Sequence, residues 1–175
     1  MVEIEDKELR RAAGEGTEAF VDLVCKATLE SVGGELTTET LPLLSADQVT
    51  LLAYWTLRRE VMEGGFIQLI HNGYGPFIFL NPFGRALKEW GLKELRNMVY
   101  DGRRLYEKYG EVLERDMDDE AFMALYEQYE AFDDLDDEFV EREEEWTSQV
   151  AHYVDDHLSD FVAVHSFSLR SSINA

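Results

Sequence analysis

An acidic segment at residues 111–160 constrains the fold of this chain more than any other feature. The segment holds twenty Asp and Glu residues against two basic ones, Arg115 and Arg142, so it carries −18 of the formal net charge of −21. Blocks of like charge are typical of disordered tails. Here, however, large apolar side chains recur at the spacing of a helix face. They are Phe122, Leu125, Tyr126, Tyr129, Leu135, Phe139, Trp146, Val150, Tyr153, Leu158 and Phe161. The pattern predicts two amphipathic helices, residues 119–132 and 134–161, with acidic outer faces.

The upstream sequence also has helical periodicity, so the predicted fold class is all-α. Ser45 and Gln48 form a capping box, and the apolar helix that follows it is the best candidate for the central core helix. Tyr74 to Pro82 is predicted to be a loop, and Gly110 to end a helix. We expect one compact multi-helix domain over residues 1–175, with about seven helices, acidic C-terminal helices and a loose tail at 162–175. The expected upstream helices cover residues 17–30, 45–62, 66–71, 84–90 and 92–109.

Composition and charge restrict the compartment and the class of partner. The apolar fraction of 45% is enough for a core, and the single cysteine, Cys25, on an apolar helix stripe, is expected to be a buried thiol in a reducing compartment. The sequence has neither a signal-peptide pattern nor a membrane-spanning apolar run, so we predict a cytoplasmic protein. The net charge repels nucleic acid, anionic lipid and phosphorylated substrates, which leaves a basic protein as the expected partner.

Two groups of residues raise the question of metal binding or catalysis. The run from Asp133 to Glu138 lacks the glycine and the twelfth-position glutamate of a calcium loop. His152, Asp156 and Asp160 are spaced four apart, near His157 and His165, and could hold a divalent metal on successive helical turns. No signature motif accompanies them, and solvated helix termini often carry such residues. We therefore predict no metal, no cofactor and no enzymatic activity, with a metal-dependent enzyme as the least favoured alternative.

The stretch from Arg59 to Gly73 combines a helix, a diglycine break and a short amphipathic helix. Its structural interpretation is a tight corner at which glycine lets two helices approach. The stretch also resembles the hallmark of a bacterial all-helical family known as DNA-mimic proteins. That resemblance rests on five structural-motif residues, Gly64, Gly65, Phe66, Gln68 and Asn72.

The C-terminal sequences at residues 135–139 and 153–161 are similar to the closing pattern of the same family. The resemblance covers roughly residues 45–161, and residues 1–40 are not matched to it. It implies a helical, dimer-forming protein whose acidic surface imitates duplex DNA and occupies the DNA-binding face of a transcription regulator.

The spacing of the acids in the second acidic helix is compatible with such mimicry. Asp133, Asp137, Glu141 and Glu145 form a row with a carboxylate about every 6 Å. With the adjacent acids, the spacing approaches one charge per about 3 Å, near the roughly 3.4 Å per strand of B-DNA. A second row would have to come from the preceding helix or from a partner subunit. The predicted partner-binding residues are Glu120, Glu127, Glu130, Asp133, Asp134, Asp137, Glu138, Glu141, Glu144 and Glu145.

The sequence therefore predicts a non-enzymatic DNA mimic that binds a basic DNA-binding protein, either a transcription regulator or a nucleoid protein. It is expected to form a homodimer and to bind neither nucleic acid nor membrane directly. The alternative is a generic acidic protein-interaction domain without mimicry.

Overall fold

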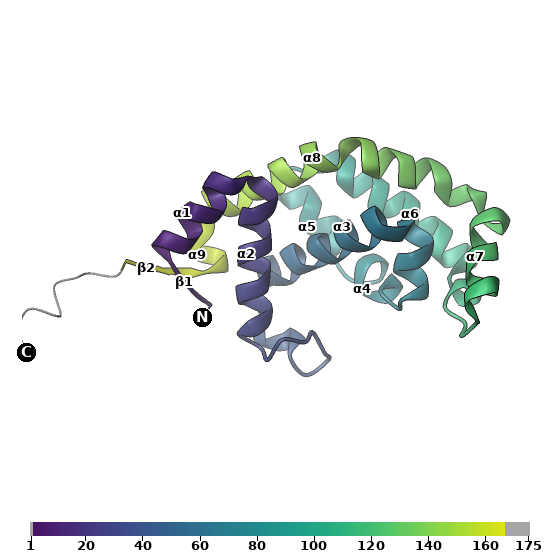
Figure 1. Ribbon diagram of the computed structural model, residues 1–175, viewed down its shortest axis with the longest axis horizontal. Coiled ribbons are helices and arrows are strands. Elements are labelled where there is room, and N and C mark those ends of the chain that lie inside the picture. Colours follow the sequence, from purple (N-terminus) through teal and green to yellow (C-terminus); the bar gives the residue numbers. More distant parts are fainter. Residues whose placement is uncertain (1, 167–175) are drawn as a thin grey trace, which may run out of the picture. The chain divides into compact units, whose positions relative to one another are not determined.

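A computed structural model describes residues 2–166 of the chain (Figure 1). The prediction of an all-α protein is confirmed, and one short pair of strands is added. The described residues form nine α-helices, against about seven predicted. The helices are α1 Asp6–Glu15, α2 Thr17–Glu30, α3 Ala46–His71, α4 Gly75–Phe79, α5 Phe83–Glu89, α6 Lys93–Leu113, α7 Asp119–Gln128, α8 Asp133–Asp156 and α9 Leu158–Phe161. Helix α1 is added before the predicted set, a helix occupies the predicted loop, and the last predicted helix is interrupted at His157, whereas the predicted helices 45–62 and 66–71 are joined in α3.

The chain divides into two compact units, and the predicted single domain over residues 1–175 stays a prediction. The first unit comprises Met1–Leu51 with Thr147–Ala175, and the second is Leu52–Trp146. None of the described helices is long and apolar enough to cross a membrane.

The first unit joins the beginning of the chain to its end. Strand β1, Glu3–Glu5, pairs in parallel with strand β2, Ala163–His165, with Ile4 opposite Val164. Helices α1 and α2 pack side by side (Figure 1). Part of the predicted loose tail is therefore a strand, whereas residues 167–175 of that tail lie outside the described residues.

Two local predictions in the first unit are confirmed. The Ser45 backbone N–H donates to Gln48 Oε1 at 2.9 Å and the Gln48 N–H donates to Ser45 Oγ at 3.1 Å, which is the predicted capping box. The Gln48 side chain also donates to the carbonyl oxygen of Phe161 at 2.7 Å. Cys25 is buried, and this burial raises the pKa of its thiol well above the ordinary value.

The second unit is built around α3, as the sequence predicts. Tyr54, Leu57 and Leu69 of this helix are fully buried. Two expectations in this unit were wrong. Residues 75–79 form α4, with Pro76 in the first turn, where proline is tolerated because its missing N–H would have no partner. Gly110 does not end α6 but lies buried within it, where the Tyr106 ring covers the space that a Cβ would need.

The predicted diglycine corner is present at Gly65, where α3 bends. Gly65 has φ +76° and ψ −177°, a backbone conformation available essentially only to glycine. A Cβ at this position would lie 2.5 Å from Oδ2 of Asp136, so the residue also allows α8 to approach the bend. Glycine is required here for its backbone conformation and for its small size.

Substitution of this glycine tests the corner. Gly65→Ala is expected to lower the free energy of unfolding by about 3 kcal/mol, because the new methyl group strains the backbone and displaces the Asp136 carboxylate. The matched control is Gly14→Ala in α1, where nothing lies within 4 Å of the added Cβ. Alanine favours the helix there, so the control should gain about 0.5 kcal/mol or more. Equal stabilities of the two variants in urea unfolding would contradict this account of the bend.

Candidate functional site

The acids of α8 lie on a single continuous helix from Asp133 to Asp156. The side chains of its inner face, Leu135, Phe139 and Trp146, are buried. All ten acids of the predicted partner-binding set are exposed. We refer to the seven on this helix as the α8 acidic face: Asp133, Asp134, Asp137, Glu138, Glu141, Glu144 and Glu145.

The α8 acidic face has a regular axial spacing because the helix is unbroken over the whole set. Asp133, Asp137, Glu141 and Glu145 follow at intervals of four residues, or about 6 Å, and the row is about 18 Å long. That length equals roughly five phosphate steps along one strand of B-DNA. One helix can therefore present a strand-like row of negative charge.

The three predicted acids that precede α8 do not form a second row parallel to this one. Glu120 and Glu127 lie on α7, and Glu130 lies in a short 3₁₀ turn, Glu130–Phe132. Figure 1 shows α7 running across the direction of the first half of α8. These acids therefore extend the charged surface at the beginning of α8 and do not form a second parallel row.

Four further acids of α8 were not in the predicted set, and the structure turns two of them, Asp136 and Glu143, inward, whereas Asp155 and Asp156 are exposed. Glu143 is buried and forms an ion pair with Arg58 of α3. Oδ1 of Asp136 accepts the backbone N–H of Phe66 at 2.8 Å. Both contacts hold α8 against α3 and thereby determine which side of α8 faces solvent.

The Asp136 carboxylate supplies a hydrogen-bond acceptor for the first backbone N–H group of the helical segment that follows the bend at Gly65. The N–H groups that begin a helical segment have no partner within the helix, and a carboxylate is a strong acceptor for them. Next to this contact, the Tyr126 hydroxyl donates to the Gly64 carbonyl oxygen at 2.8 Å. The diglycine corner is thus held by one side chain from α7 and one from α8.

The environment of Asp136 disfavours its charged form. Burial raises the pKa of this carboxyl to about 6; the charges of Asp133 and Asp137 add to the increase, and the hydrogen bond from Phe66 opposes it. Crowding of carboxylates along α8 therefore also affects the carboxylate that supports the corner.

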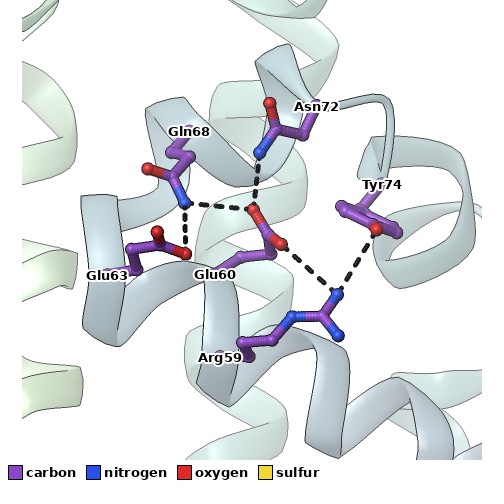
Figure 2. Close-up of polar contacts among 6 residues, drawn as sticks. All are labelled: Arg59, Glu60, Glu63, Gln68, Asn72 and Tyr74. Atoms are coloured by element: carbon purple, nitrogen blue, oxygen red, sulfur yellow. Dashed lines mark hydrogen bonds and ion pairs between the residues drawn. The ribbon is translucent and has the colours of Figure 1, made fainter.

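The two remaining motif residues, Gln68 and Asn72, belong to a polar network around Glu60 (Figure 2). The buried Glu60 carboxylate accepts from Asn72 Nδ2 at 2.8 Å and from Gln68 Nε2 at 3.2 Å. Arg59 lies 3.4 Å from the same carboxylate and 3.3 Å from the Tyr74 hydroxyl. A buried carboxylate needs such donors. Gln68 and Asn72 thus stabilise the two helical segments on either side of the bend.

One member of the α8 acidic face is partly neutralised. Arg142 pairs with Glu145 at 3.0 Å and with Glu94 of α6, and its guanidinium lies 4.9 Å from the centre of the Trp146 ring. The hydrogen bond to Glu94, followed by that to Glu145, raises the pKa of Arg142 above its ordinary value. Within residues 2–166, none of the other six acids of the face forms an ion pair.

The arrangement of His152, Asp156 and Asp160 gives the metal alternative no support. The Nδ1 atoms of His152 and His157 lie 2.6 and 2.8 Å from the backbone carbonyl oxygens of Ser148 and Tyr153. Among residues 2–166, no group of three or more His, Cys, Asp or Glu side chains is placed to hold a metal ion. The acidic run at the start of α8 is helical, so it does not form the loop that a calcium site requires.

Sequence reasoning missed the partners of the inward-facing residues. Arg58 and Glu143 are 85 positions apart, and Phe66 and Asp136 are 70 apart. A signal was available in the helical period, because Asp136 and Glu143 lie on the same side as Leu135 and Phe139. That position indicates burial but does not identify the opposing donor.

Comparisons with known proteins match the part of the chain that contains these features. A family model described as "DMP19-like protein" matches residues 42–157. The DNA mimic protein DMP19 of Neisseria meningitidis serogroup B (strain ATCC BAA-335 / MC58) is 34% identical over 127 residues, which are 72% of this chain and 77% of that relative.

The raised pKa of Asp136 predicts a specific pH dependence. In the pH range between the ordinary value of 3.8 and the folded value of about 6, the folded protein holds more protons at this carboxyl than the unfolded chain does. The contribution of Asp136 to stability is therefore present at low pH and is lost as pH rises through about 6. Asp136→Asn keeps an acceptor for Phe66 and does not titrate, so its stability relative to wild type should increase from about pH 4 to about pH 6 and then level off.

Urea unfolding of both proteins at several pH values measures this difference. Asp136→Ala is the control: it removes the acceptor as well as the charge, and it should be less stable than Asp136→Asn by about 1 kcal/mol throughout. A stability difference between wild type and Asp136→Asn that does not change with pH would contradict the assignment.

Proposed function

Because this chain belongs to the DMP19-like protein family, we propose that it is a DNA mimic whose α8 acidic face occupies the DNA-binding surface of a basic protein. The partner is a transcription regulator or a nucleoid protein, and its occupied surface is then closed to DNA. The protein acts by binding and not by catalysis. The α8 acidic face carries the proposal, with Glu120, Glu127 and Glu130 as an extension at its beginning.

The continuous exposure of the acids on α8 is the observation that most favours mimicry. Six of the seven acids of the face form no ion pair within residues 2–166, although Lys or Arg at intervening positions would relieve their repulsion. Like charges at i and i+4 cost a few tenths of a kcal/mol per pair in the free helix. A basic partner removes that repulsion on binding, so the free protein is poised to bind positive charge.

The structure of the second unit supports the orientation of the face. Two acids of α8 face inward: Glu143 pairs with Arg58, and Asp136 accepts the hydrogen bond from Phe66. The opposite side, with Asp137, Glu141 and Glu144, is thereby directed to solvent. A rigidly oriented row loses little conformational entropy on binding.

The proposal also includes location and assembly. A competitor of DNA has to share a compartment with DNA, which for a bacterial protein is the cytoplasm. The strong negative charge opposes direct contact with nucleic acid or with an anionic membrane surface. The homodimer implied by the family resemblance stays a prediction, and a second copy is one source of the second row that a duplex-like surface needs.

A generic acidic interaction domain is the alternative, and one observation favours it. Because α7 runs across α8, one chain offers one regular row and a more diffuse acidic region (Figure 1). A diffuse surface attracts many basic proteins with little selectivity, whereas a mimic displaces DNA from a particular one.

Displacement from immobilised duplex DNA distinguishes the two functions. DNA-binding proteins of the host cell are retained on a DNA column at low salt, and the full chain is then passed over it. We expect release of one or a few basic proteins, with release falling steeply as salt rises because counterions are given up on binding. The variant Asp137→Asn/Glu141→Gln/Glu144→Gln should release at least about fivefold less, which corresponds to about 1 kcal/mol of lost affinity.

The control variant, Glu8→Gln/Glu30→Gln/Glu35→Gln, changes the net charge equally at exposed positions far from α8 in the sequence. It should release as much protein as the wild type. Equal losses in the two variants would favour the generic acidic domain. An absence of release by the wild-type chain at low salt would contradict mimicry.

A further inference from the structure

A polar pocket in the second unit is separate from the α8 acidic face. It has a volume of about 350 Å³ and opens between the end of α3 and the beginning of α7. The residues of its lining that bear on binding are Glu63, Gln68, His71, Asn72, Asp119 and Phe122. The pocket lining thus includes three residues from the stretch that contains the diglycine corner: Gln68, His71 and Asn72.

The side-chain N–H groups of Gln68 and Asn72 donate hydrogen bonds within the protein. Oxygen and nitrogen acceptors of the pocket residues are thereby left for a ligand. Gln68 Nε2 donates to Glu60 and Glu63, at 3.2 and 3.3 Å. Asn72 Nδ2 donates to Glu60, and Figure 2 shows the amide oxygen of Asn72 directed away from that contact. The amide of Asn72 can therefore offer its oxygen to a ligand.

His71, which also lines the pocket, has one ring nitrogen engaged within the protein. Its Nδ1 lies 2.8 Å from the Leu113 carbonyl oxygen, and because a carbonyl only accepts, Nδ1 carries the proton. In the neutral ring, Nε2 then has a lone pair for a donor. The ring lies against Phe122, with 4.6 Å between ring centres, which fixes its plane.

Two exposed carboxylates, Glu63 and Asp119, complete the lining. Neither forms an ion pair within residues 2–166. A metal ion is not the ligand that this lining fits, because the described residues include no group of three metal-ligating side chains. The pocket therefore suits an organic cation that carries several N–H donors and has a flat, partly apolar surface.

We propose that this pocket receives an arginine side chain of the basic partner, an inference that rests on the proposed function. The guanidinium has five N–H donors in one plane and stacks on aromatic rings, so it matches spaced acceptors beside Phe122 better than the compact ammonium of lysine does. The α8 acidic face attracts positive charge along its length, whereas one filled pocket sets the register of the partner.

Binding of a small probe tests the pocket without any partner protein. The probe is N-acetyl-arginine amide, added to the ¹⁵N-labelled full chain and followed by NMR. We expect saturable shifts of the Asn72 side-chain amide and of the backbone amides around Asp119 and Phe122. N-acetyl-citrulline amide, which has nearly the same shape without the charge, should bind at least tenfold more weakly, and N-acetyl-lysine amide at least threefold more weakly.

The double variant Glu63→Gln/Asp119→Asn should weaken binding of the arginine probe at least fivefold while keeping the wild-type spectrum elsewhere. The matched variant Glu30→Gln/Glu35→Gln has the same net charge and should bind the probe as the wild type does. Shifts that do not saturate, equal binding of citrulline, or equal losses in the two variants would overturn the proposal.

The same variants separate failure of the pocket from failure of the proposed function. If the wild-type chain binds the arginine probe but releases no protein from DNA, the pocket stands as a guanidinium site and its role in partner register is overturned. If the chain releases a DNA-binding protein and the double variant releases it equally well, the pocket proposal fails and DNA mimicry stands.

Discussion

The hydrogen bond from the Phe66 backbone to Asp136 is the contact on which the arrangement of the second unit depends. It supplies the acceptor that the helix needs after the bend at Gly65, and it brings α8 to that bend. The close approach is possible because position 65 has no Cβ. Once Asp136 is directed inward, the helical period directs Asp137, Glu141 and Glu144 outward. Together with the buried Glu143, which pairs with Arg58, this partly buried carboxylate orients a row of exposed ones.

The acids of this chain consequently have two different tasks. Glu60, Asp136 and Glu143 are wholly or partly buried, and each has donors that compensate for its desolvation: amides for Glu60, a backbone N–H for Asp136 and a guanidinium for Glu143. The acids of the α8 acidic face are solvated and, apart from Glu145, have no ion pair within residues 2–166. The first group specifies the fold, and the second group is available to a partner. The cost of crowding is visible in the pKa of Asp136, which the neighbouring charges help to raise.

Features that depend on nearby residues could be predicted from the sequence, and features that depend on distant contacts could not. The capping box at Ser45, the limits of the helix over residues 17–30 and the exposure of the ten predicted acids all follow from local spacing. Helix α4 was missed because Pro76 and the flanking aromatics resemble a loop, although proline fits a first helical turn. Gly110 was expected to end a helix, but it lies within α6, where the Tyr106 ring occupies the space that a side chain at position 110 would need. The pairing of β1 with β2 joins residues some 160 positions apart, and no local sequence pattern predicts a contact over that distance.

Carboxylate footprinting of the complex tests the central claim most directly. Exposed carboxylates are modified by a carbodiimide and an amine in the free chain and in the presence of a basic DNA-binding protein that it releases from DNA, and the sites are read by mass spectrometry. The account predicts strong protection of Asp137, Glu141 and Glu144, with unchanged modification of Glu30 and Glu35. Protection spread evenly over all exposed acids, or confined to acids away from α8, would contradict the claim that this helix presents the DNA-like surface.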